Sequence, residues 1–179
     1  MQETSSQVYW QLLPPVLPRE AGKKMTKYVL SVDPGKATGM ALFSLQTGQE
    51  PVLEWSGEFQ QHEYAEPIRA VLSNPEMAEN LSIVCERFTI NAQTLRNSQS
   101  PYSLEQIGIL KQCMLDAGRQ PEDIVFQAPA DAKAMFPNEA LKFLEYWHRG
   151  GEGHALDAIR HALLRLVKLG WKPIKLLER

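Results

Sequence analysis

The sequence predicts an α/β fold with a mixed five-stranded sheet, in which three antiparallel strands are followed by parallel strands and helices flank the sheet. Two observations lead to this prediction. Three segments rich in strand-forming residues follow one another with short connections, at residues 28–32, 39–45 and 52–59, as in an antiparallel meander. Helical and strand segments then alternate, which favours parallel strands joined by crossover helices. The predicted order is therefore βββ-α-β-α-β-α.

The first half of the chain supplies the meander and one helix. The strand at residues 28–32 ends at an Asp-Pro-Gly turn, residues 33–35, and a Thr-Gly turn at residues 47–48 separates the second strand from the third. A helix is predicted at residues 64–72, where apolar residues recur at helical spacing.

The second half alternates helices with two further strands. Residues 81–85 form a buried type of strand that ends at Glu86, and a polar, irregular stretch follows it. The remaining elements are predicted in this order: a helix with Ser103 as its N-cap that ends at Gly118, a strand at residues 124–126, short helices after Pro129 that reach residue 148, and a final helix at residues 154–169.

Length and composition set the class of protein. At 179 residues and 20.3 kDa, the chain has the length of one domain, which we expect at residues 25–179 after a flexible tail at residues 1–24. No apolar run has the roughly 20 residues of a membrane helix, and the start lacks the basic leader of a signal peptide. Its two cysteines lie in apolar segments, so we expect a reduced, cytoplasmic protein rather than a disulfide scaffold.

Charge is unevenly distributed along the chain, although the net charge is only −2. Residues 50–80 hold seven acidic residues and one arginine, whereas residues 158–179 hold six basic residues and one acid. The basic end favours a nucleic-acid partner. The alternative is a charged helix face that is simply solvated.

Three acidic residues stand where a site would be built. Asp33 and Glu86 end the first and fourth strands, and Asp157 lies in the first turn of the final helix. If these ends share one edge of the sheet, the carboxylates repel one another unless cations neutralise them, and such oxygen ligands suit Mg²⁺ or Mn²⁺. Each acid also has an ordinary explanation, as a turn residue, a solvated strand end or a partner of the helix dipole.

The final helix carries a polar stripe. At 100° per residue, one side of the helix gathers the residues His154, Asp157, His161, Arg165 and Lys168. The opposite side is apolar and is expected to face the core. The stripe predicts a metal-binding pair at the amino end followed by basic residues that contact a phosphate backbone, here Arg165 and Lys168, or else an ordinary solvent-exposed face.

Three motifs resemble those of RuvC-type Holliday junction resolvases. Residues 32–41, Val-Asp-Pro-Gly-Lys-Ala-Thr-Gly-Met-Ala, resemble the first-strand motif Asp-Pro-Gly-x-x-x-Gly-x-Ala. Residues 82–86 resemble the strand that carries the second acid of this family, and residues 154–162 are similar to its terminal motif. The motifs occur in the family's order over residues 25–169. The short middle of the chain is similar to phage-encoded RuvC-like proteins.

The resemblance implies an RNase H-like fold and a metal-dependent, structure-specific endonuclease of DNA recombination and repair. Such an enzyme is a homodimer that resolves four-way junctions by paired nicks, which leave 5′-phosphate and 3′-hydroxyl ends. Catalysis would use two Mg²⁺ or Mn²⁺ ions about 4 Å apart and no nucleotide cofactor. By match to the motifs, the catalytic residues and metal ligands are Asp33, Glu86, His154 and Asp157.

Two further DNA contacts follow from the resemblance. Lys133 lies in a segment similar to the one in which the family carries a lysine near the scissile phosphate. Phe88 lies near the position of an aromatic residue that inserts at the junction, and the alternative for it is burial in the core. The glycine-rich basic loop of the family is replaced by Met-Phe-Pro-Asn at residues 135–138, which weakens the case for strict junction selectivity.

Three alternatives to a resolvase are considered. A nuclease of the same fold could act on flaps or RNA, similar to the YqgF branch, and a branched-DNA binding protein could keep the fold without cleaving. An actin-like ATPase is disfavoured because 179 residues cannot hold two duplicated subdomains. The helix at residues 103–118 has a broad apolar arc, which would serve a dimer interface or a helix buried within its own monomer.

Overall fold

The computed structural model describes residues 26–90, 101–149 and 153–173 of the chain. The tail predicted at residues 1–24 and most of the irregular stretch predicted before residue 101 lie outside these ranges. None of the helices described is long and apolar enough to cross a membrane.

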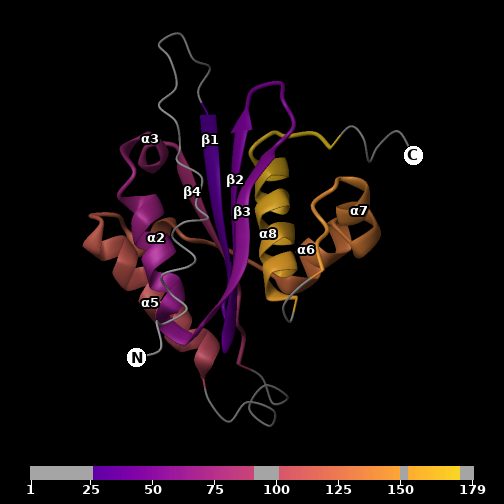
Figure 1. Cartoon of the computed structure of the whole chain (residues 1–179). Helices are drawn as coiled ribbons and strands as arrows, with labels where there is room; N and C mark the ends of the chain where they lie inside the picture. Colours follow the sequence, from indigo (N-terminus) through magenta and orange to yellow (C-terminus); the bar gives the residue numbers. More distant parts are fainter. Residues whose placement is uncertain (1–25, 91–100, 150–152, 174–179) are drawn as a thin grey trace, which may run out of the picture.

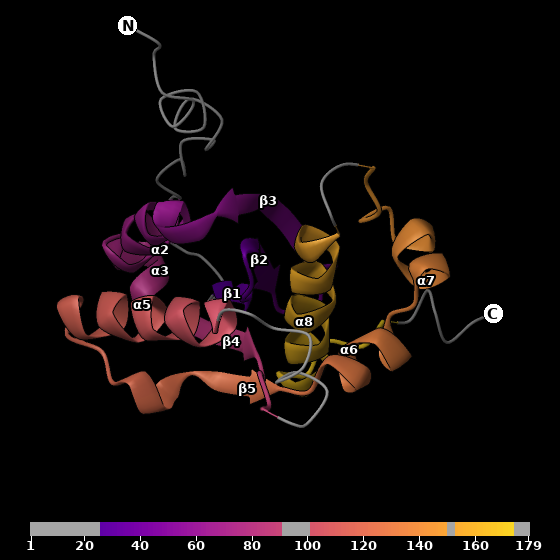
Figure 2. The ribbon, with the colours of Figure 1, turned by 90° about the horizontal axis from the view of Figure 1, so that it is seen from below.

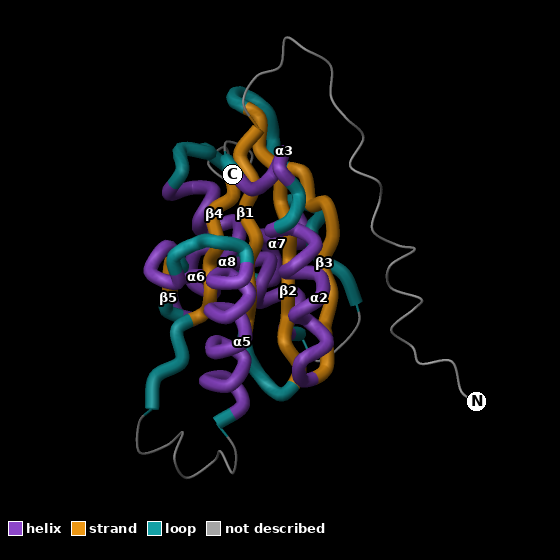
Figure 3. The backbone as a smooth tube through the Cα atoms, turned by 90° about the vertical axis from the view of Figure 1, so that its left-hand side faces the viewer, coloured by secondary structure: helices purple, strands orange, loops and turns teal. Residues whose placement is uncertain are grey.

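A single mixed sheet organises the molecule, as predicted. Its strands lie in the order β3-β2-β1-β4-β5, with β1 and β3 antiparallel to β2, and β4 and β5 parallel to β1. Figure 3 shows the strands side by side in this order. Their bounds are β1 Thr26–Asp33, β2 Ala37–Gln46, β3 Val52–Gln60, β4 Leu81–Glu86 and β5 Val125–Gln127.

Helices cover both faces of the sheet and make a three-layered molecule (Figures 1 and 2). One face carries α2 (Ala65–Leu72), α3 (Pro75–Ala78) and α5 (Tyr102–Asp116), with the 3-10 turn η2 (Gln61–Tyr64) leading into α2. The other face carries α6 (Pro129–Met135), α7 (Asn138–Phe143) and α8 (His154–Lys168). A second 3-10 turn, η3 (Pro121–Asp123), precedes β5.

Strand β1 divides the core into two clusters. Its residues Tyr28, Leu30 and Val32 pack into the cluster beneath α2 and α5, whereas Val29 packs into the cluster beneath α6, α7 and α8. Because side chains alternate between the faces of a strand, Ser31 and Asp33 also face α8. This central strand is therefore buried on both sides, as expected for a strand with neighbours on both edges and helices on both faces.

Two predicted boundaries are wrong. Ser103 does not cap α5, which begins after Pro101; instead the Ser103 hydroxyl donates to the Pro34 carbonyl at 2.8 Å and ties the helix to the turn that follows β1. The helix expected to reach residue 148 ends at Phe143, and Glu145 follows with a φ of 63°. That left-handed backbone conformation cannot continue a right-handed helix.

Gly39 allows α8 to approach the sheet. A Cβ atom built at Gly39 would lie 2.0 Å from the carbonyl oxygen of His154 and 2.7 Å from the amide nitrogen of Ala155. Both are backbone atoms, which cannot rotate away as a flexible side chain would. The first turn of α8 therefore rests directly on β2, in contact that any larger residue would prevent.

We expect Gly39→Ala to destabilise the protein by about 3 kcal/mol or more, because the methyl group forces α8 away from the sheet. Gly57→Ala is the matched control, since a Cβ there meets only the Phe59 ring, at 3.5 Å. Urea unfolding of both variants measures the difference. Equal stability of the two variants would contradict the close contact between α8 and β2.

Candidate active site

The carboxyl ends of β1 and β4 bring two of the predicted acids together. The strands are parallel and Val32 pairs with Cys85, so Asp33 and Glu86 follow at the same level of the sheet. Both side chains contact residues of α8, and the first turn of that helix contains His154 and Asp157. The sequence prediction that these elements share one edge is thus reproduced by the fold.

Asp33 lies at the centre of this edge and is only 5% exposed. Its Oδ2 atom is 2.8 Å from Nδ1 of His154. Burial raises the pKa of Asp33 above its ordinary value; the hydrogen bond from His154 opposes that effect, and the charges of Glu86 and Asp157 add to it. A buried carboxylate beside two others calls for a cation.

His154 is the hydrogen-bond partner of Asp33. The hydrogen bond to Asp33 raises the pKa of the His154 imidazole, partial burial lowers it, and the charges of Asp33, Glu58 and Asp157 raise it further. The net direction is upward, so the imidazole holds a proton at a higher pH than an unperturbed histidine does. In this structure His154 is therefore a proton-holding partner of the buried acid.

In the metal-free protein, we expect the pKa of His154 to lie above the ordinary histidine value and to fall in Asp33→Asn, because the amide supplies no negative charge. A titration of the histidine ring protons by nuclear magnetic resonance measures both values. The amide spectrum of the variant serves as the control for an intact fold. An unchanged pKa would show that Asp33 is not the group that acts on His154.

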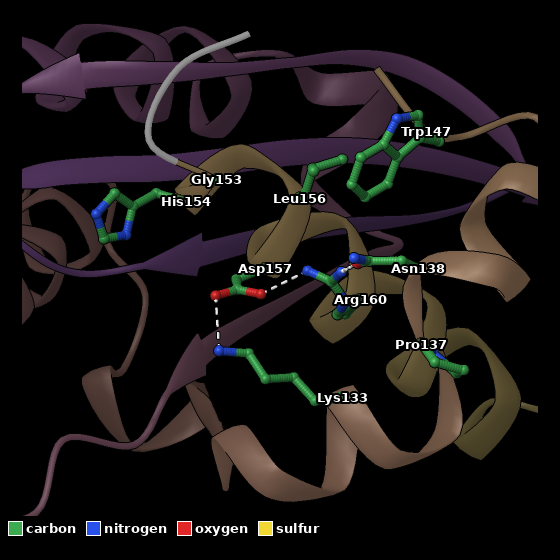
Figure 4. Close-up of a pocket in the computed structure, with 9 residues that line it drawn as sticks. All are labelled: Lys133, Pro137, Asn138, Trp147, Gly153, His154, Leu156, Asp157 and Arg160. Carbon is green, nitrogen blue, oxygen red and sulfur yellow. Dashed lines mark hydrogen bonds and ion pairs between the residues drawn. The ribbon is translucent and has the colours of Figure 1, made fainter. Parts of the chain in front are cut away.

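Asp157 is held by two basic residues. Its carboxylate lies 3.0 Å from Nζ of Lys133 and 2.6 Å from a guanidinium nitrogen of Arg160 (Figure 4). Arg160 is 7% exposed and also donates to the Phe136 carbonyl at 3.0 Å and to the side chain of Asn138. This arginine therefore fixes α6 and α7 against α8, and it orients Asp157 at the same time.

Glu86 is held by His161, a histidine that the sequence analysis placed on an accessible polar side of the final helix. His161 is 1% exposed, which contradicts the prediction of a solvent-facing stripe along the whole helix. Its Nε2 lies 3.0 Å from Glu86, and its Nδ1 lies 2.9 Å from Oε1 of Gln127. The stripe is buried here because β4 and β5 present polar side chains toward α8, so the two polar surfaces meet.

Sequence reasoning missed Glu58. This residue of β3 accepts hydrogen bonds from the backbone amides of Gly153, at 2.8 Å, and Ala155, at 3.2 Å. Its carboxylate thereby caps the amino end of α8, where a negative charge is favourable. The spacing of Glu58 within its own strand gives no sign of this role, because its partners lie 95 and 97 residues further along the chain.

The predicted DNA contacts fall at different distances from the acids. Lys133 touches Asp157, and Phe88 is half-buried against the core beneath α2 and α5. Arg165 donates to the hydroxyl of Ser82 at 2.9 Å, toward the other end of α8. Lys168 is exposed at the last residue of that helix, about 21 Å from His154 along the axis. The fold thus brings Lys133, but not Lys168, to the acidic site.

The donor groups suit a divalent cation, since carboxylates and an imidazole are ligands for Mg²⁺ or Mn²⁺. In the part of the chain that is described, no three acidic, histidine or cysteine residues are grouped closely enough to bind a metal as they stand. Each acid instead faces a basic group, Asp33 facing His154, Glu86 facing His161, and Asp157 facing Lys133. The residue types fit a metal, which would replace Lys133 as the partner of Asp157.

Comparisons with known proteins identify the fold. No protein-family model and no curated protein matches the sequence. Among solved structures, Thermus thermophilus RuvC is similar with 16% identity and a TM-score of 0.57, over 80% of this chain and 96% of that one. The same protein in complex with a Holliday junction substrate gives a TM-score of 0.56, with the same identity and coverage. The large terminase of a thermophilic bacteriophage gives 0.40 at 16% identity, over 86% of this chain and 42% of that one.

The chain therefore has an RNase H-like fold, as the motifs implied. The mixed sheet, with three antiparallel strands followed by parallel strands and helices on both faces, is the part of the prediction that this likeness confirms.

Proposed function

We propose that the protein is a metal-dependent, structure-specific DNA endonuclease that resolves four-way junctions or other branched DNA. One observation carries this proposal: three acids from separate elements, Asp33, Glu86 and Asp157, gather at one edge of an RNase H-like sheet. A structure of similar fold binds a Holliday junction, which supports branched DNA as the substrate. The activity would serve recombination or repair in the cytoplasm, and its type would be that of phage-encoded RuvC-like proteins.

The ligands of the proposed metal site are Asp33, Glu86, Asp157 and His154. When bound, Mg²⁺ or Mn²⁺ would lower the pKa of a coordinated water and would stabilise the negative charge on the departing 3′ oxygen. Asp33 would be the central ligand, because the charges of both Glu86 and Asp157 act on its carboxyl group. His161 and Arg160 hold the outer two carboxylates in place. His154 can hold a proton at the edge of the site, or it can ligate directly.

Lys133 is the proposed contact for the scissile phosphate. Its side chain is 56% exposed and reaches Asp157 from α6, so an ammonium group already lies at the site. Phosphate oxygens would take the place of that carboxylate as its partner once a metal binds Asp157. The other proposed DNA contacts, Phe88, Arg165 and Lys168, lie further from the acids.

A homodimer belongs to this proposal. A four-way junction has two strands to cut, and a twofold dimer presents two equivalent sites. Helix α5 buries Ile107, Leu110 and Met114 against the sheet, and it leaves Leu104 and Leu115 exposed, at 41% and 52%. These two leucines are available to a second copy of the chain.

We expect Asp33→Asn to lower the cleavage of a labelled four-way junction by more than about 100-fold. Loss of a residue that only supports a metal ligand lowers activity by about 10- to 100-fold, and loss of a ligand itself should cost more. Binding of the junction should persist, because the amide keeps the shape of the side chain. A gel assay with Mg²⁺ or Mn²⁺ measures cleavage, and a mobility-shift assay measures binding. In the wild-type protein, paired symmetric nicks with 5′-phosphate ends are expected.

The same assay separates the alternatives. Flaps, linear duplex and RNA–DNA hybrid are compared with the junction. Preferential cleavage of flaps or hybrid would assign the metal site to a different nuclease, such as a YqgF-like one. Binding without any cleavage by the wild-type protein, in either metal, would replace the enzyme proposal with a non-cleaving DNA-binding protein.

Lys133→Met is expected to have opposite effects on two ligands. Affinity for Mn²⁺ should rise, because the ammonium group no longer competes for Asp157. Affinity for DNA should fall. The slope of log affinity against log salt concentration should decrease in magnitude by about 1, because one phosphate contact is lost. Electron paramagnetic resonance measures Mn²⁺ binding. Lys111→Met, on the opposite face of the sheet in α5, is the control; equal Mn²⁺ affinity of the two variants would refute the competition.

A further inference from the structure

A cavity of about 450 Å³ adjoins the acidic site, between the start of α8 and the helices α6 and α7 (Figure 4). It is called the Trp147 cavity here, and its lining includes Trp147, Pro137 and Leu156 together with Asn138 and Lys133. His154 and Asp157 line it as well, so the cavity continues directly from the proposed metal ligands. Its size lies in the range of about 300–1,000 Å³ that is usual for small-ligand sites.

The lining has two chemical characters. Trp147, Pro137 and Leu156 form apolar surface, whereas the Asn138 amide and the Lys133 ammonium group supply polar and positive groups beside the Asp157 carboxylate. A ligand that matches this lining has a flat apolar face, a hydrogen-bonding edge and a negative charge nearby. A nucleotide has all three, with its base, its base edge and its phosphate.

Trp147 is held at the edge of the cavity by three contacts. The residue is half-buried and packs against the core cluster beneath α8. Its amide donates to the Leu141 carbonyl at 3.2 Å, and Nζ of Lys142 lies 5.1 Å from the ring centroid. Lys142 therefore makes a cation–π contact that helps to orient the indole.

We propose that the Trp147 cavity binds an unpaired nucleobase of the strand whose phosphate lies at the acidic site, stacked on Trp147. This inference rests on the proposed DNA-processing function and names the part of the substrate that the cavity recognises. A base within a duplex must leave its stack to enter, whereas a base at a branch point or in a single strand enters at lower cost. The cavity thus favours branched or single-stranded DNA over continuous duplex.

Affinity for a single-stranded oligonucleotide tests the proposal without any need for cleavage. Trp147→Ala should lower this affinity about tenfold, within the range found for the loss of one stacked base. Affinity for linear duplex should change little, and Trp147→Phe should retain most of the single-strand affinity because phenylalanine also stacks. Trp55→Ala is the matched control, since Trp55 is half-buried against the core on the opposite face of the sheet.

Photocrosslinking locates the base in the unsubstituted protein. A single-stranded oligonucleotide that contains 5-iododeoxyuridine is irradiated in the complex, and the attached peptide is sequenced by mass spectrometry. Attachment at Trp147 is the expected result. Attachment elsewhere in the chain, or equal single-strand affinity for Trp147→Ala and Trp55→Ala, would overturn the proposal even if junctions are cleaved. Failure of the proposed function is distinct, since the wild-type protein would then cleave no substrate.

Discussion

The contact between the first turn of α8 and the sheet is the constraint on which the rest of the site depends. Gly39 lets the helix backbone rest on β2, Glu58 accepts the amides of Gly153 and Ala155, and the Ser31 hydroxyl donates to the Ala158 carbonyl. These contacts come from three adjacent strands and fix both the height and the rotation of the helix. With the backbone so placed, the side chain of His154 lies against Asp33.

The interface between α8 and the sheet contains several paired polar groups, and these groups specify the register of the helix. Along the helix, His154 meets Asp33, His161 meets Glu86, and Arg165 meets Ser82. A shift of α8 by one turn would leave several of these groups buried without partners, at a cost of about 1–3 kcal/mol each. The apolar residues of α8 supply most of the burial, whereas this polar series selects one position of the helix.

The strands, their mixed pairing and the acids at the strand ends could be predicted from the sequence, because these features follow from local periodicity and turn chemistry. The burial of His161 was not predicted, because a helical wheel shows which residues share a side of the helix but not what that side faces. Glu58 and Trp147 were missed for a related reason. Their roles arise from contacts or cavities between segments that are distant along the chain, and neither residue stands in a motif.

Each acid of the site has a nitrogen-bearing side chain beside it, and these contacts limit the repulsion among the three carboxylates. Asp33, Glu86 and Asp157 would repel one another if each were left bare, and the burial of Asp33 would strengthen that repulsion. His154 lies against Asp33, His161 lies against Glu86, and Lys133 lies against Asp157. Metal binding at Asp157 would then release the ammonium group of Lys133. Of the three partners, Lys133 has the most exposed side chain, and it is therefore the one best able to turn toward a phosphate.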